Sequence, residues 1–126
     1  MTQELRDVVD RLKAVAHPVR LRVLSLLAGG ELCVCQVAEV LGVPLSSASE
    51  ALRELKRAGF VTERREGRWV FVSMVPEAEA SPLLKGLVQD VDQLAVVIED
   101  RKRAGEVRAL SVPEVCCKVQ KEVDRV

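Results

Sequence analysis

The feature that most constrains the fold is a pair of short helical patterns followed directly by an alternating pattern, between residues 33 and 73. The first pattern runs from about Cys33 to Leu41 and stops at a Gly-Val-Pro turn at residues 42–44. The second covers residues 45–58 and stops at Gly59, with Ala48, Ala51, Leu52 and Leu55 on its inner side. Two short helices across a turn that contains glycine form a helix-turn-helix.

The segment after this helix pair predicts a β-hairpin. Apolar and polar residues alternate from Val61 to Ser73 around Glu66-Gly67, which places Gly67 where a tight turn needs positive φ. A hairpin directly after a helix-turn-helix is the wing of a winged helix. The sequence therefore predicts a mainly α fold with one β-hairpin, a winged helix-turn-helix.

Helical patterns also flank this unit. Apolar residues recur at helical spacing between Leu5 and Ala16, and Pro18 suits the first turn of a second helix that Gly29-Gly30 ends. An apolar stripe after Pro76 is predicted to form a dimer interface, because the core already has several helices. Its residues are Leu84, Leu87, Val91, Leu94 and Ile98.

The chain length allows one domain with a terminal arm. We divide its 126 residues into a winged helix-turn-helix and dimerisation domain at 1–104 and a C-terminal tail at 105–126. Gly105 opens this tail, and Pro113 is suited to start a last short helix that carries Cys116 and Cys117.

Composition indicates whether the chain folds, in which compartment it resides and how its cysteines are used. The formal net charge is zero and 48% of the residues are apolar, so the chain is expected to fold. The N-terminus is charged and no apolar run is long enough to span a bilayer, which predicts a cytoplasmic protein with no membrane partner. Thiols stay reduced there, so four cysteines are more typical of metal ligands, redox sensors or core residues than of a disulfide framework.

The second helix of the pair and the hairpin carry residues suited to double-stranded DNA. Small hydroxyl side chains can approach phosphates or base edges, and basic side chains can neutralise phosphates. Each residue alone is better explained as a helix cap or solvated surface, but a basic hairpin directly after a helix-turn-helix favours DNA binding for the set as a whole. The predicted DNA-binding residues, which need no cofactor, are Leu45, Ser46, Ser47, Ser49, Arg53, Lys56, Arg65 and Arg68.

The cysteines predict a site for a soft ion, because thiolates prefer soft ions. Cys33 and Cys35 lie two apart, so they point to different sides of a regular helix and can share an ion only if its first turn distorts. Two geometries remain open. The tail pair completes a site with them, within or between subunits, or the tail pair binds alone. Cys33 and Cys35 are also consistent with a buried apolar pair.

The segments at residues 16–24, 31–35, 41–43 and 52–61 together resemble the arsenic-repressor (ArsR/SmtB) family of dimeric winged-helix metal sensors. The resemblance implies a homodimeric repressor of a resistance or efflux operon that leaves its operator when trivalent arsenic or antimony binds. Two departures stand out. Ala38 occupies the position of a usual third cysteine, and Glu50-Ala51 replaces a common basic residue and histidine. The implied ligands are Cys33, Cys35, Cys116 and Cys117.

Other ions and functions rank lower. Cadmium and lead sensors of the family add N-terminal cysteines, which this sequence lacks, and its sole histidine, His17, lies at a helix junction rather than in a zinc site. An inorganic and an organic arsenical both remain open. The alternatives are a redox- or persulfide-responsive repressor and a winged-helix module that binds proteins. One histidine, no tyrosine and no nucleophile–base pair predict that the protein is no enzyme.

Overall fold

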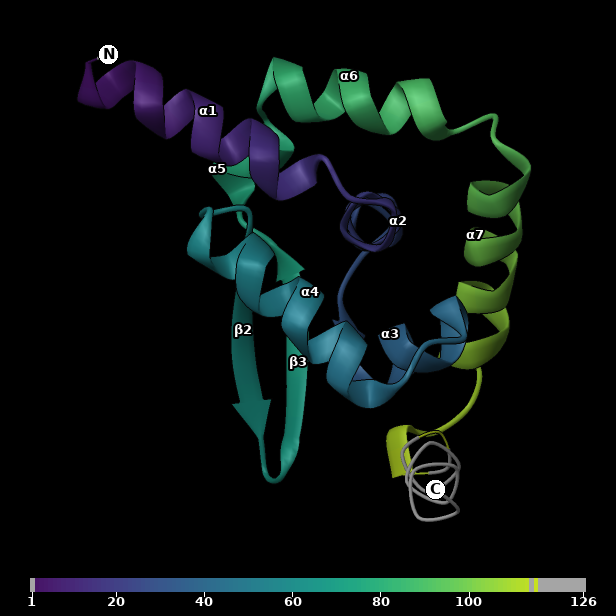
Figure 1. Ribbon diagram of the computed structural model, residues 1–126. Helices are drawn as coiled ribbons and strands as arrows, with labels where there is room; N and C mark the ends of the chain where they lie inside the picture. Colours follow the sequence, from purple (N-terminus) through teal and green to yellow (C-terminus); the bar gives the residue numbers. More distant parts are fainter. Residues whose placement is uncertain (1, 114, 116–126) are drawn as a thin grey trace.

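The computed structural model describes residues 2–113 and residue 115 (Figure 1). It is mainly helical with one small antiparallel sheet, which confirms the predicted fold class. In chain order the elements are α1 (Gln3–Val15), α2 (Pro18–Leu27), β1 (Leu32–Cys33), α3 (Val34–Leu41), α4 (Leu45–Arg57), β2 (Val61–Glu66), β3 (Trp69–Met74), α5 (Pro76–Glu79), α6 (Pro82–Val91) and α7 (Ala95–Arg108).

Helices α3 and α4 form the predicted helix-turn-helix. Gly42 ends α3 with a φ of 66°, a left-handed conformation that glycine adopts without steric cost. Its N–H donates to the carbonyl oxygen of Ala38 at 3.0 Å, which closes the last turn of the helix. Buried Ala48 and Leu55 fix the inner side of α4, so its opposite side faces outward.

The wing consists of β2 and β3, paired antiparallel from Val61↔Met74 to Glu66↔Trp69. Gly67 in the turn has a φ of 62°, as the sequence predicts. A third strand, β1, pairs with the other edge of β3 through Cys33↔Phe71, giving the order β1-β3-β2. Because β1 ends where α3 begins, Cys33 is both the last strand residue and the N-cap of α3.

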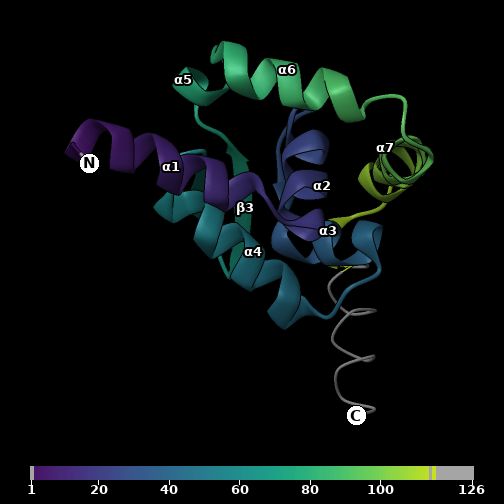
Figure 2. The same cartoon turned by 45° about the horizontal axis from the view of Figure 1, so that its top comes forward.

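Helix α2 lies at the centre of the fold and contacts α1, α3, α4, α6, α7 and β3 (Figure 2). Val23, Leu24, Leu26 and Leu27 are all at most 2% exposed, so this helix supplies much of the core. Among the described residues, no helix combines the length and apolar character needed to cross a membrane.

The region after Pro76 does not form the single apolar stripe that the sequence predicts. Helix α6 ends at Val91, the chain turns, and α7 runs along α2 and α3 instead of continuing straight. Leu84 and Val91 are buried in the core of the same subunit, at 2% and 8% exposure, and only Leu94 and Ile98 of the stripe are exposed. The turn allows Val97 and other apolar residues of α7 to be buried. Helix α7 passes through the predicted boundary at Gly105 and ends at Arg108.

Charged side chains hold α7 against the helix-turn-helix. Arg22 of α2 donates from Nε and Nη2 to the two oxygens of Asp100 at 2.8 and 2.7 Å. The side chain of Asp100 is only 5% exposed, and its hydrogen bonds raise the pKa of Arg22. Arg103 donates to the backbone oxygen of Glu39 in α3 at 3.3 Å. Helix α7 is therefore fastened to both α2 and α3.

Candidate nucleic-acid interface and thiol site

Helix α4 presents Ser46 on its outer side, with Ser47 and Ser49 on its two flanks, where Ser47 lines a pocket with His17 and Val19. Ser46 is exposed, whereas Ser47 and Ser49 are half-buried. Pro44, not Ser46, is the N-cap of α4, so Ser46 lies in the first turn and the capping explanation for it does not apply. Arg53 is exposed one helical turn beyond Ser49. This side of α4 can therefore enter a DNA groove with its serines first.

The basic residues of the wing divide into two kinds. Arg64 donates to both carboxylate oxygens of Glu31, at 2.7 and 2.9 Å, and its guanidinium lies 4.5 Å from the ring centre of Phe71. These hydrogen bonds raise the pKa of Arg64 and commit it to the structure of the wing. Arg65 is exposed, and Arg68 lies over the ring of Trp69 at 4.5 Å.

The basic residues predicted to contact phosphates differ in whether they already form an ion pair with a carboxylate. Lys56 pairs with Glu63 at 2.9 Å. Within residues 2–113, no carboxylate pairs with Arg53, Arg65 or Arg68. These three arginines therefore offer positive charge to a phosphate backbone without first breaking an ion pair.

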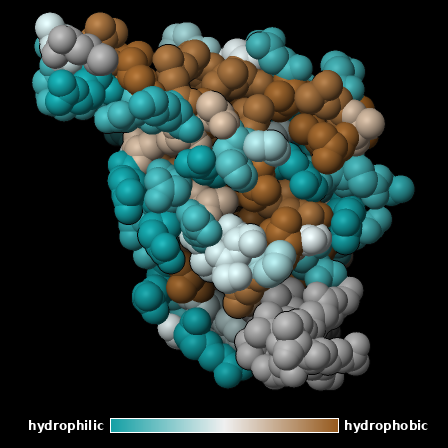
Figure 3. Space-filling view, in the orientation of Figure 1, coloured by the Kyte–Doolittle hydropathy of each residue, from teal (hydrophilic) through white to brown (hydrophobic). Residues whose placement is uncertain are grey.

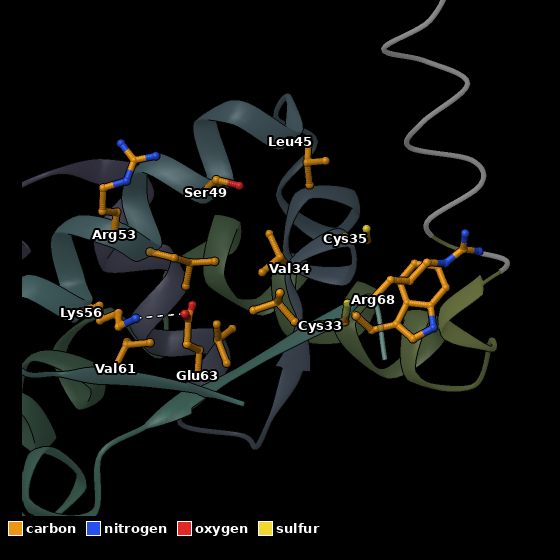
Figure 4. A pocket seen from close by; sticks show the side chains of 14 residues that line it. Cys33, Val34, Cys35, Leu45, Ser49, Arg53, Lys56, Val61, Glu63 and Arg68 are labelled. Carbon is orange, nitrogen blue, oxygen red and sulfur yellow. Dashed lines mark hydrogen bonds and ion pairs between the residues drawn. The ribbon is translucent and has the colours of Figure 1, made fainter. Parts of the chain in front are cut away.

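A cavity of about 440 Å³ lies between α4, the beginning of α3 and the wing (Figure 4). Figure 4 shows Ser49 and Arg53 on the helix along one side, Lys56 and Glu63 at one end, and Cys33, Cys35 and Arg68 at the other. The structure thus brings two of the four predicted thiol ligands and five of the eight predicted DNA-binding residues to one cavity. The predicted DNA-binding residues that line it are Leu45, Ser49, Arg53, Lys56 and Arg68.

The two described cysteines differ in state. Cys33 is free and 1% exposed, and its N–H donates to Oε1 of buried Gln36 at 2.8 Å, which fixes the first turn of α3. Cys35 is half-buried and disulfide-bonded, and free Cys33 is not its partner. The predicted ligands Cys116 and Cys117 lie outside the described residues. In the part of the chain that the structure describes, no three histidine, cysteine or acidic residues gather as a metal site.

An exposed apolar surface lies on α1 and α6. Leu5, Val8 and Leu12 of α1 are 41–54% exposed, and Leu83 of α6 is 47% exposed. Figure 3 shows the apolar band that runs over this part of the molecule. The helical spacing of the α1 residues is visible in the sequence, but it does not distinguish a surface stripe from a core stripe.

Comparison with known proteins places these features in a family. Residues 17–63, which include the helix-turn-helix, match the family model of the bacterial regulatory protein, arsR family. An HTH-type transcriptional regulator of Methanocaldococcus jannaschii is 39% identical over 93 residues, covering 73% of this chain and 99% of the relative. The arsenic resistance transcriptional regulator ArsR1 of Pseudomonas putida is 37% identical over 79 residues, covering 60% of this chain and 62% of the relative.

A solved structure of a possible member of the same family also matches this chain. The winged helix-turn-helix DNA-binding domain of a possible ArsR-family regulator from Mycobacterium bovis, described as homodimeric, superposes with a TM-score of 0.61 and 40% identity. The match covers 69% of this chain and 79% of that one. These relatives are DNA-binding transcriptional regulators and not enzymes, as the sequence predicts for this chain. The chain belongs to the ArsR family of winged helix-turn-helix transcriptional regulators.

Proposed function

We propose that the protein is a homodimeric repressor that leaves its operator DNA when trivalent arsenic or antimony binds its cysteine thiolates. The observation that carries this proposal is the cavity at which Cys33 and Cys35 adjoin Ser49, Arg53 and Arg68. An ion bound at these thiols lies next to the DNA-contacting side chains. Its preference for one arrangement of α3 and α4 over another is the coupling free energy, typically about 1–3 kcal/mol.

The DNA-binding part of the proposal assigns different tasks to arginines and serines. Arg65→Ala or Arg68→Ala is expected to weaken binding to all DNA sequences alike and to lower the salt dependence by about one ion each. Ser47→Ala or Ser49→Ala is expected to change the preference among operator sequences. Fluorescence anisotropy with operator and scrambled duplexes at several salt concentrations measures both effects.

Arg57→Ala provides the matched control for these variants. Arg57 is also an exposed cation of α4, but it pairs with Glu54 at 3.5 Å and faces the groove between α1 and α4. Its loss is expected to leave DNA affinity unchanged. Equal losses from the arginine and serine variants on every duplex would contradict the division of tasks.

The effector part of the proposal rests on the cysteines. Cys35 supports it, because this half-buried residue lines the cavity and supplies a thiolate there once it is reduced. Trivalent arsenic and antimony are soft and bind such thiolates. Zinc fits less well, because residues 84–100 contain no histidine and two of the carboxylates there, Asp92 and Asp100, already pair with Arg101 and Arg22.

Replacing Cys116 and Cys117 together with serine is expected to leave operator affinity within about twofold but to abolish release by arsenite. The reason is that Ala38 supplies no third thiolate beside Cys33 and Cys35. Release of labelled operator from the reduced proteins measures the effect. The Cys33→Ser/Cys35→Ser variant then separates the geometries. Loss of release favours a shared site, and retained release favours the tail pair alone. Normal release from the tail variant would refute a sensing role for the tail.

A redox-responsive repressor is the second candidate, and the disulfide at Cys35 favours it. In that case peroxide releases DNA with a mass loss of two hydrogens per disulfide formed, and reduced protein binds no arsenite. Tight binding of arsenite by the reduced protein decides for the metalloid sensor. The protein-interaction module has no such support, since the relatives are named transcriptional regulators.

A further inference from the structure

The middle of the outer face of α4 carries a carboxylate, Glu50. Ser46 lies one helical turn before it and Arg53 one turn after it, and all three side chains are exposed. Buried Ala48 marks the opposite side of the helix, because two residues of an α-helix turn through about 200°. A groove of DNA that receives Ser46 and Arg53 therefore also receives Glu50.

The carboxylate of Glu50 has no ion-pair partner in the part of the chain that the structure describes. Arg53 lies three residues further along the same face, and Arg20 lines a pocket with Glu50, but neither forms an ion pair with it. The next carboxylate of the helix, Glu54, differs because it pairs with Arg57 at 3.5 Å. Glu50 is therefore available to a group outside the subunit.

A free carboxylate on a DNA-binding face needs a specific partner on the DNA. Phosphates repel it, so it opposes the sequence-independent attraction that basic residues provide. An ionised carboxylate only accepts hydrogen bonds. In the major groove, the donors on the base edges are the N4 amino group of cytosine and the N6 amino group of adenine. Adenine also presents the acceptor N7 beside its donor, which repels a carboxylate, so cytosine is the better partner.

We propose that Glu50 accepts a hydrogen bond from the N4 amino group of a cytosine in the major groove and so determines one base pair of each operator half-site. This inference rests on the proposed function and adds a base that the operator contains. The hydroxyl of neighbouring Ser46 can donate or accept, so it discriminates less between bases. On DNA without cytosine at this place, Glu50 stays unpaired among phosphates and weakens binding, which excludes wrong sites.

Glu50→Gln tests the choice of base with almost no change in the size of the side chain. A glutamine amide both donates and accepts, so it suits adenine, with its donor N6 and acceptor N7. Wild type and variant each select duplexes from a randomised library. The selected sites are expected to differ at one base pair per half-site, with cytosine for the wild type and adenine for the variant. Fluorescence anisotropy with the matched duplexes is expected to show a preference of at least about fivefold in each direction.

A modified base tests the hydrogen bond itself. N4-methylcytosine still pairs with guanine but carries a methyl group in place of the amino hydrogen that faces the major groove. At the selected position it is expected to lower wild-type affinity by at least about fivefold. It is expected to leave the affinity of Glu50→Ala unchanged, because this variant has no acceptor there. Glu50→Ala is also expected to bind scrambled DNA at least as tightly as the wild type, since a charge that phosphates repel is gone.

Glu54→Gln is the matched control. It removes the same charge one turn further along α4, from a side chain that pairs with Arg57 and lines the groove between α1 and α4. This variant is expected to select the same duplexes as the wild type. Circular dichroism checks the fold of all the variants.

The outcomes separate this inference from the proposed function. A folded Glu50→Gln protein that selects the wild-type sites overturns the role of Glu50 and leaves the repressor standing. The same conclusion follows if the wild type tolerates N4-methylcytosine at every cytosine of its site, or if Glu50→Ala loses affinity equally on every duplex. Failure of the wild type to select any sequence overturns the proposed function itself.

Discussion

A Val8→Glu/Leu12→Glu variant is expected to run as a monomer and to lose at least about a hundredfold in operator affinity. Both side chains lie on the outer face of α1, at 41% and 43% exposure, so the subunit can fold with charge there. We propose that the homodimer forms through the exposed apolar band over α1 and α6, so this face is buried in the dimer, where an unpaired carboxylate is costly. A monomer also loses the gain from binding two half-sites at once, which is typically about 10²- to 10⁴-fold.

Light scattering and DNA anisotropy on the same samples measure both consequences. The matched comparison is Leu94→Glu/Ile98→Glu, which changes the two exposed residues that remain of the originally predicted stripe, at the beginning of α7. We expect this variant to stay dimeric, because the exposed apolar band runs over α1 and α6. A V8E/L12E protein that is still dimeric at micromolar concentration would place the interface elsewhere.

The second large effect concerns the ion pair that fastens α7. Asp100→Ala is expected to lower the free energy of unfolding by about 2–3 kcal/mol, because it leaves the guanidinium of Arg22 without its bidentate partner. The loss is somewhat below that of a fully buried pair, since the side chain of Arg22 is 24% exposed. Urea denaturation followed by circular dichroism gives the value.

Two further variants test the reason for this loss. Arg22→Met/Asp100→Leu removes both charges and replaces them with apolar side chains, so it is expected to recover most of the lost stability. Glu31→Ala removes the carboxylate that accepts two hydrogen bonds from Arg64 on the exposed wing, and its effect is expected to be much smaller. An Asp100→Ala protein as stable as the wild type would show that burial of apolar residues alone holds α7.

The sequence predicts the DNA-binding half well because its signals are local. Gly42 and Gly59 end the helices of the pair, and Gly67 turns the hairpin, and all three have positive φ. Strand β1 escapes prediction because two residues show no periodicity. The break between α6 and α7 escapes it for another reason. The apolar spacing continues across residues 92–94, and the turn is explained by contacts of α7 with residues about 80 positions earlier, such as Arg22.

The candidate site is predicted only in part for a similar reason. The spacing of Cys33 and Cys35 and the serines of α4 can be read directly, because each signal lies within one segment. The cavity cannot be read in this way, because it exists only where α4 faces the wing. Trp69 is half-buried on β3 and has no sequence pattern of its own, yet it forms part of the same lining as Ser49 and Cys35.

The docking of α7 has a consequence for how the protein is made. Asp100 and Arg103 contact Arg22 and Glu39, so the DNA-binding half is complete only after residues far downstream have been synthesised. Contacts of such sequence separation form late and slow the approach to the native state. A nascent chain that ends at the wing leaves apolar positions of α2 and α3 uncovered. We therefore expect chains that stop before α7 to be less stable, and more readily cleaved by proteases, than chains that include it.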